Sequence, residues 1–190
     1  MAPFDYLLVL ASVILGLSAC ELAVGVNRLL GAWGRVRWDW LAPLAALLAF
    51  LKLVTQWWTW HGAVAMAAGI TFEMYLAVLA GAVLLFMLAA AALPIAAGGE
   101  ESLDLRDHYA RVQRRFWTLF TLHFVIAVGT SIWIQMRIAH AHFLLLTPAW
   151  LILPVAISLI FVRSRIWHGI ALVALCLVYL VQYWGQTLPG

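Results

Sequence analysis

Six long runs of apolar residues, separated by short polar or basic segments, dominate the pattern along the chain. The runs cover residues 5–30, 40–60, 71–93, 116–136, 143–162 and 166–186. Each is close to the roughly 20 residues that a helix needs to cross the hydrocarbon core of a bilayer. Apolar and polar residues do not alternate within the runs, as they would in the strands of a membrane barrel. The pattern therefore predicts an all-α integral membrane protein, in which residues 1–190 form one bundle of about six transmembrane helices.

The main polar segment, residues 102–115, has its own helical pattern. Leu105, Tyr109, Val112 and Phe116 recur at the spacing of one helix face. Acidic residues lie near its start and arginines near its end, which complements the helix dipole. We predict a short amphipathic helix on the cytoplasmic membrane surface, running into the fourth span.

The small apolar segment 62–70 leaves two alternatives open. It lengthens the third apolar run beyond what one untilted crossing needs. Either it is a loop tucked among the helices, or the third span begins early and Glu73 lies deep in the bilayer.

The basic residues predict an orientation. The loops after the first, third and fifth spans carry Arg28, Arg35, Arg37, Arg106, Arg111, Arg114, Arg115, Arg163 and Arg165. The opposite side has only Arg137, and Lys52 lies within a span. Because loops that stay in the cytoplasm are enriched in Lys and Arg, we expect a multi-pass protein of a bacterial inner membrane with both termini in the periplasm. The net charge of +3 reflects these helix ends and does not indicate a nucleic-acid partner.

Short matches between the two halves suggest two inverted three-helix repeats. Three features recur in the same order: Ala23-Val24-Gly25 and Ala127-Val128-Gly129, Pro43 and Pro148, Trp60-His61-Gly62 and Trp167-His168-Gly169. Three spans per half would give the halves opposite topology, as in many transporters. Chance similarity in a chain rich in Ala, Val and Gly is the alternative.

Composition agrees with a lipid environment and offers little for catalysis. Hydrophobic residues make up 66% of the chain and charged residues 10%, against about 25% charged in soluble domains. Cys20 and Cys176 lie in apolar runs without metal or redox spacing. His123 with His168, and His61 with His140 or His142, could share a level as haem ligands would. His61, His140 and His142 fall at helix ends or loops, which disfavours haem, and no catalytic motif occurs. We expect no enzyme activity, no metal and no cofactor.

Ionisable and polar residues inside the spans are the candidate site. They are Glu21, Arg28, Lys52, Gln56, Glu73, His123 and Thr130. Two interpretations remain open. The charges could form structural pairs, Glu21 with Arg28 and Lys52 with Glu73, or the residues could line a path for ions or protons, since buried charge in lipid usually has a function.

These residues favour a channel or transporter for an ion, a proton or a small solute. The competing interpretation is a non-catalytic accessory or scaffold subunit of a larger membrane complex, because small-residue and Trp-rich helix surfaces can pack on partner helices. The expected partners are the lipid bilayer and either further copies of this chain or other membrane subunits.

Two segments also carry a resemblance. Phe4-Asp5-Tyr6-Leu7-Leu8-Val9-Leu10 with Gly16-Leu17, and Leu103-Asp104-Leu105-Arg106-Asp107-His108-Tyr109, resemble segments of uncharacterised small bacterial polytopic inner-membrane proteins. The similarity covers mostly the first four spans. It implies a polytopic membrane protein and no particular activity.

Overall fold

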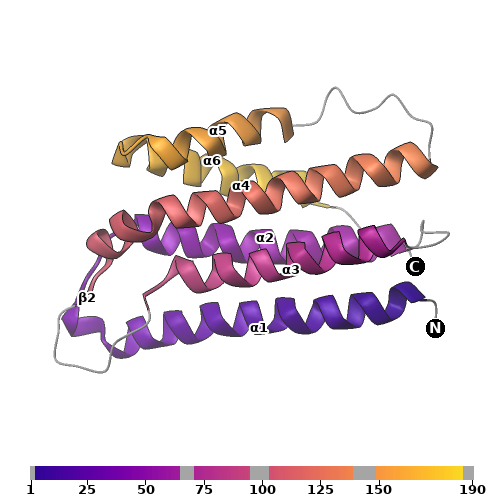
Figure 1. Cartoon of the computed structure of the whole chain (residues 1–190). Coiled ribbons are helices and arrows are strands. Elements are labelled where there is room, and N and C mark those ends of the chain that lie inside the picture. The colour runs from indigo at the N-terminus through magenta and orange to yellow at the C-terminus, as the bar shows by residue number, and fades with distance from the viewer. Residues whose placement is uncertain (1–2, 65–70, 95–102, 139–148, 186–190) are drawn as a thin grey trace.

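The protein is a bundle of α-helices that lie roughly along one direction (Figure 1). The structure, a computed structural model, describes residues 3–64, 71–94, 103–138 and 149–185. Its helices are α1 (Pro3–Gly31), α2 (Leu41–Val64), α3 (Phe72–Ala92), α4 (Leu105–Ile138), α5 (Ala149–Phe161) and α6 (Arg165–Tyr183). The prediction of an all-α fold is confirmed.

Five of these helices, α1, α2, α3, α4 and α6, are long and apolar enough to cross a membrane. This is consistent with a multi-pass membrane protein. The described part of the predicted fifth span is α5, which has 13 residues and contains Pro154. Residues 139–148, which include Pro148, lie outside the described part of the chain. A sixth crossing therefore stays a prediction.

The boundary between α2 and α3 decides between the two alternatives for segment 62–70. Helix α2 continues to Val64, and α3 begins at Phe72. The side chain of Thr71 caps α3 by accepting a hydrogen bond from the backbone N–H of Met74 at 3.5 Å. Glu73 thus lies in the first turn of α3, and the alternative of an early helix start is wrong. Residues 65–70 lie outside the described chain.

The polar segment before the fourth span is the first part of α4, a continuous helix of 34 residues. Leu105, Tyr109 and Phe116 of its apolar stripe are buried within the protein. Asp104 caps the helix, since its Oδ1 accepts hydrogen bonds from the backbone N–H groups of Arg106 (2.9 Å) and Asp107 (3.1 Å). These bonds, that of Asp107 foremost, together with the positive charge of Arg37, hold the pKa of Asp104 below its usual value. Its position at a membrane surface stays a prediction.

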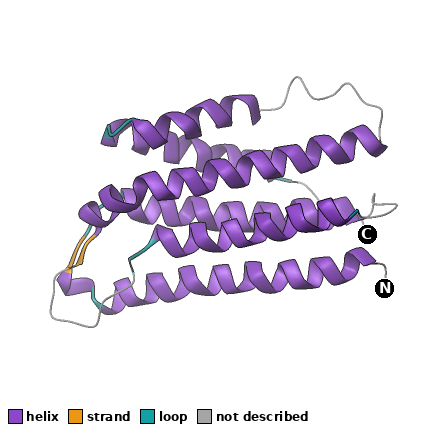
Figure 2. Ribbon diagram, in the orientation of Figure 1, coloured by secondary structure: helices purple, strands orange, loops and turns teal. Residues whose placement is uncertain are grey.

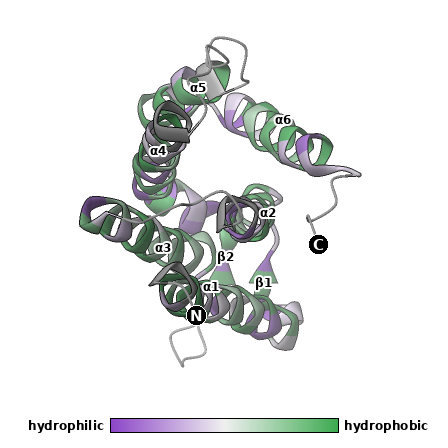
Figure 3. Cartoon of the chain, turned by 90° about the vertical axis from the view of Figure 1, so that its right-hand side faces the viewer, coloured by the Kyte–Doolittle hydropathy of each residue, from purple (hydrophilic) through white to green (hydrophobic). Residues whose placement is uncertain are grey.

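Neighbouring helices pack in an order that does not follow the sequence. Helix α1 lies against α2 and α3, α3 against α4, α4 against α5, and α6 against α2. The end-on view places α1 at one edge of the bundle and α5 and α6 at the other, with apolar residues on all helices (Figure 3). The centre of the bundle is therefore formed by α2, α3 and α4.

One end of the bundle holds a small strand pair and three ion pairs, one of them between Asp107 and Arg111 within α4. Strands β1 (Val36–Arg37) and β2 (Leu103–Asp104) pair in parallel beside the 3₁₀ helix η1 (Trp33–Arg35) (Figure 2). Arg37 lies 3.1 Å from Asp104, and Arg165 forms an ion pair with Asp39. The nine arginines on which the orientation rests belong to segments at this end, which we call the arginine-rich end. The side of the membrane it faces stays a prediction.

Candidate functional site

Three helices bring the predicted residues Lys52, Gln56 and His123 together in the middle of the bundle. Lys52 and Gln56 are one turn apart on α2, and Lys52 Nζ donates to Gln56 Oε1 at 3.4 Å. Nε2 of His123, on α4, lies 3.1 Å from the same oxygen. Nδ1 of His123 lies 3.2 Å from the backbone oxygen of Gly81 on α3. We call this set the His123 network.

The His123 network is buried and lacks a carboxylate. Lys52, Gln56 and His123 are 7%, 5% and 1% exposed, and the buried polar side chains of the described residues include no Asp or Glu. Lys52 Nζ instead lies 5.2 Å from the ring centre of Tyr179 and 5.8 Å from that of Phe124. Aromatic faces attract a cation at such distances. Lys52 therefore points into the bundle, and the expected pairing of Lys52 with Glu73 gives way to one with Gln56.

The hydrogen-bond roles in the His123 network conflict in the arrangement described. The carbonyl of Gly81 can only accept, so Nδ1 of His123 must carry a proton. Gln56 Oε1 also only accepts, so Nε2 of His123 must carry a proton too. Both histidine nitrogens are then protonated beside the ammonium of Lys52. Two positive charges would lie close together in a buried site, which is costly without a paired anion.

Rotating the Gln56 amide by 180° reverses these roles. The amide nitrogen then donates to Nε2 of a neutral His123, and Lys52 can keep its contact only as a neutral amine that accepts. With the amide oxygen toward it, His123 therefore carries a proton on both nitrogens, whether Lys52 is an ammonium or an amine; with the amide rotated, His123 and Lys52 are both neutral. Protonation of His123 and Lys52 is therefore coupled to the orientation of one amide.

A second histidine, His168 on α6, lies in a network near the arginine-rich end. Its Nε2 lies 2.8 Å from the backbone oxygen of Val162, and its Nδ1 lies 2.8 Å from the hydroxyl of Tyr109. The indole N–H of Trp117 donates to that hydroxyl and to Nδ1, at 3.1 Å each. We call this set the His168 network.

All roles in the His168 network agree for a neutral histidine. Nε2–H donates to Val162, Nδ1 accepts from Tyr109 and Trp117, and the tyrosine oxygen accepts from Trp117. Tyr109 belongs to the apolar stripe predicted from the sequence, and neither Tyr109 nor Trp117 is among the predicted site residues. A signal was present, because Tyr109 and Trp117 are two buried aromatic residues with polar groups on one helix.

An aromatic layer on α4, which includes Trp117 of the His168 network, lies between His123 and Tyr109 along the helix. Phe120 stacks on Phe124 with ring centres 6.3 Å apart, and Trp117 meets Phe120 edge to face at 5.4 Å. Phe120 and Trp117 are fully buried. The layer places apolar side chains between the protonatable groups of the two networks.

On the other side of His123, Glu73 and Thr130 line a small cavity between α3 and α4. Its volume is about 200 Å³, and Trp133, Met74, Ala77 and Gly129 complete its wall. Thr130 donates hydrogen bonds to two carbonyls of its own helix, those of Ile126 and Ala127. The cavity lies toward the end of the bundle opposite the arginine-rich end, where α3 begins.

Glu21 and Arg28 do not join the His123 network. Both lie on α1, where Glu21 is partly exposed and Arg28 is exposed. The ion pairs recorded within the described chain do not include one between them. His123 has its partners on α2 and α3. The structure thus supports neither the expected Glu21–Arg28 pair nor a direct link between Glu21 and His123.

Metal ligation and similarity to known proteins add no further assignment. Within the described residues, no three His, Cys, Asp or Glu side chains are placed to hold a metal ion. No protein-family model, curated protein or solved structure matches the chain. The resemblance to small bacterial membrane proteins stays a prediction, and a functional assignment depends on the geometry of the networks.

Proposed function

We propose that this protein moves protons across a bacterial inner membrane, with the His123 network as the buried proton site. The observation that carries the proposal is the conflict of hydrogen-bond roles around Gln56. A network that is fully bonded with a second proton on His123 in one amide orientation, and without it in the other, can take up and release a proton by turning one amide. Ionisable groups at such depth in lipid are costly and usually serve transport.

The arrangement around the network supports access from one side. Thr130 is seven residues from His123 on α4, and Glu73 is eight residues from Gly81 on α3, which places the Glu73 cavity roughly 10–12 Å away at 1.5 Å per residue. The aromatic layer of Phe120 and Trp117 lies on the other side. In the expected orientation the cavity opens toward the periplasm, and the aromatic layer is the barrier toward the cytoplasm.

A second observation favours water at the network. The hydroxyl of Tyr179, whose ring contacts Lys52, is buried and has no hydrogen-bond partner within the described chain. Buried polar groups without a protein partner commonly bind ordered water. Water at this position would connect Lys52 to a path for protons through the bundle. The predicted inverted three-helix repeats belong to this proposal, because they would allow the two halves to open the site to alternate sides.

Proton flux in liposomes tests the proposal. Purified protein is reconstituted into vesicles that contain a pH-sensitive dye, and flux is driven by a pH gradient or by a potassium-diffusion potential. Wild-type protein should dissipate the gradient. The His123→Gln variant should fold and lose the flux, since glutamine keeps hydrogen-bonding capacity but cannot exchange a proton near neutral pH.

A matched variant provides the control. His61→Gln changes an exposed histidine on α2 that stacks on Trp57 outside the network, and it should retain wild-type flux. Melting temperatures in detergent establish that each variant is folded. Wild-type protein without proton flux under any gradient, or His123→Gln with unchanged flux, would overturn the proposal.

A scaffold role remains the second candidate, favoured by the surface of α1. This helix is the least buried of the five that could span a membrane, and Val9, Val13 and Leu17 are exposed along it. Such a surface suits packing on helices of a second copy or of another subunit. Constant co-purification with other membrane subunits from native membranes, together with absent flux, would favour this role over transport.

A further inference from the structure

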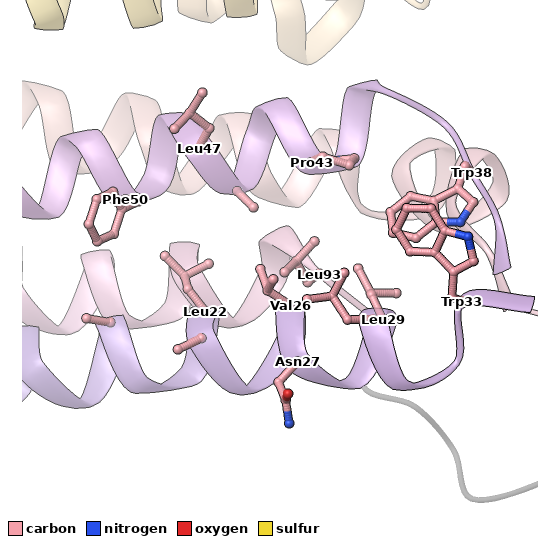
Figure 4. A pocket seen from close by; sticks show the side chains of 14 residues that line it. Leu22, Val26, Asn27, Leu29, Trp33, Trp38, Pro43, Leu47, Phe50 and Leu93 are labelled. Carbon is pink, nitrogen blue, oxygen red and sulfur yellow. The ribbon is translucent and has the colours of Figure 1, made fainter.

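A long apolar groove runs between α1 and α2 at the arginine-rich end. Its volume is about 650 Å³. Leu22, Val26 and Leu29 of α1 line one wall, Phe50 of α2 points toward α1 from the other, and Leu93 lies at the floor (Figure 4). The floor lies deep because α1 approaches the end of α3 closely, where a side chain on Gly25 would come within 3.0 Å of Leu93.

The length of the groove matches one leaflet of a bilayer. Along α1 its lining extends from Ala19 to Leu30, which at 1.5 Å per residue is roughly 16 Å. The hydrocarbon core of a bilayer is about 30 Å thick, so one leaflet supplies about half of that. The groove therefore has the depth of a single acyl chain that enters from the arginine-rich side.

The mouth of the groove carries groups that suit a phosphate headgroup. Trp33 and Trp38 meet there with ring centres 4.6 Å apart, and both are exposed (Figure 4). Arg35, in the same 3₁₀ helix as Trp33, and Arg28, in the last turn of α1, are exposed and take part in no recorded ion pair of the described chain. Indole rings favour the headgroup level, and guanidinium groups bind phosphate.

We propose that this groove binds one anionic phospholipid from the leaflet at the arginine-rich end. One acyl chain lies between α1 and α2, and the phosphate lies at the mouth beside Trp33, Trp38 and Arg35. Charge complementarity favours an anionic lipid, because Arg28 and Arg35 are exposed cations and a lipid phosphate supplies the opposite charge. The site is separate from the His123 network, so it does not depend on proton transport.

Native mass spectrometry in detergent tests the site. The protein is incubated with equal amounts of phosphatidylglycerol and phosphatidylethanolamine that carry the same acyl chains. We expect one retained adduct of phosphatidylglycerol per chain. Arg35→Gln should lower the occupancy by phosphatidylglycerol about five-fold, the effect of one basic residue near an anionic lipid surface. Arg106→Gln, which removes an exposed arginine outside the groove, should not.

A second pair of variants tests the acyl chain. Ala23→Phe places a large ring in the groove lining, whereas Ala80→Phe places the same ring at an exposed position of α3 outside it. Only Ala23→Phe should abolish the adduct, and the melting temperatures of both variants establish that they are folded. Equal occupancy by the two lipids, unchanged binding to Ala23→Phe, or cross-linking of a second copy through the groove would overturn the proposal.

Discussion

Each of the two buried histidines of this bundle contacts a backbone carbonyl with one ring nitrogen. They differ at the other nitrogen, which meets hydrogen-bond donors at His168 and an acceptor at His123. One nitrogen of each bonds a backbone carbonyl, that of Gly81 in α3 for His123 and that of Val162, between α5 and α6, for His168. At the other nitrogen, His168 meets a hydroxyl and an indole N–H, which can both donate. His123 meets an amide oxygen that cannot. The comparison teaches that burial alone does not distinguish a structural histidine from one that exchanges protons.

The partner set explains the difference. A tyrosine hydroxyl can donate one bond while it accepts another, so Tyr109 completes the His168 network with one neutral tautomer. A glutamine amide offers an acceptor on one side and a donor on the other. The orientation of the Gln56 amide therefore determines whether His123 carries one proton or two.

The largest expected contrast is in flux. Lys52→Met should reduce proton flux to that of protein-free liposomes, because the network loses one of its two proton carriers. Its melting temperature should stay the same or rise, since replacing a buried charge by an apolar side chain of similar size is often neutral or stabilising. Dye-based flux and detergent melting measure both. A Lys52→Met variant with wild-type flux would show that the His123 network does not carry the protons.

At His168 we expect a substitution to lower stability and to leave proton flux unchanged. His168→Leu leaves the carbonyl of Val162 without its donor and the hydroxyl of Tyr109 without its acceptor. A buried polar group that loses its partner costs about 1–3 kcal/mol. Tyr109 is buried whereas Val162 is exposed, so stability should fall by about 1–3 kcal/mol while the refolded protein keeps proton flux. Chemical unfolding in mixed micelles measures the loss. His61→Leu, at an exposed position, should stay within about 0.5 kcal/mol of the wild type.

Two glycines provide a matched pair of smaller effects. A Cβ on Gly169 would lie 1.9 Å from Cη2 of Trp40, so Gly169→Ala must displace that indole and should cost about 1–2 kcal/mol. A Cβ on Gly81 would lie 3.7 Å from the nearest atom, Nδ1 of His123, which is an ordinary contact. Gly81→Ala should therefore be neutral or stabilising by up to about 1 kcal/mol through its helix propensity. Melting of the two variants side by side checks the order.

The smallest effect is spectroscopic. Nitrogen-15 NMR of histidine-labelled protein should show His168 as one neutral tautomer with its proton on Nε2. His123 should show two populations, one protonated on both nitrogens and one on Nδ1 alone, and their ratio should change in Lys52→Met. A single unchanging tautomer for both histidines would mean that the networks do not differ in the proposed way.

Much of the fold could be predicted, because the bilayer fixes the length of an apolar helix. The apolar runs 5–30, 40–60 and 71–93 correspond closely to α1, α2 and α3. The same runs do not reveal the packing order, since helices that are apolar on all sides carry no marked face. The run 143–162 contains α5, and the strand pair at residues 36–37 and 103–104 is too short to leave a pattern.

The candidate site could be predicted only in part, because helical spacing shows which residues of one helix share a face but not which helices meet. The spacing of Lys52 and Gln56 placed them on one face of α2, and the structure joins them by a hydrogen bond. Which helix supplies their partner depends on tertiary packing, so the contact of Gln56 with His123 could not be read from spacing. Glu21 was included because a charge in a span suggests function, but a charge does not show whether its helix lies at the centre or at the edge.

The strand pair and the ion pairs at the arginine-rich end also constrain how the protein is made. β1 cannot pair with β2 until α2 and α3 have left the ribosome, because both helices lie between the strands in the chain. The ion pair of Asp39 can form only later, because its partner Arg165 is the first residue of α6. The contacts at this end of the bundle therefore form in two stages during synthesis. The strand pair can form when the start of α4 has been made, and the Asp39–Arg165 ion pair when the start of α6 has been made. A nascent chain stopped between these points would hold its first three helices together while Asp39 still lacked its arginine.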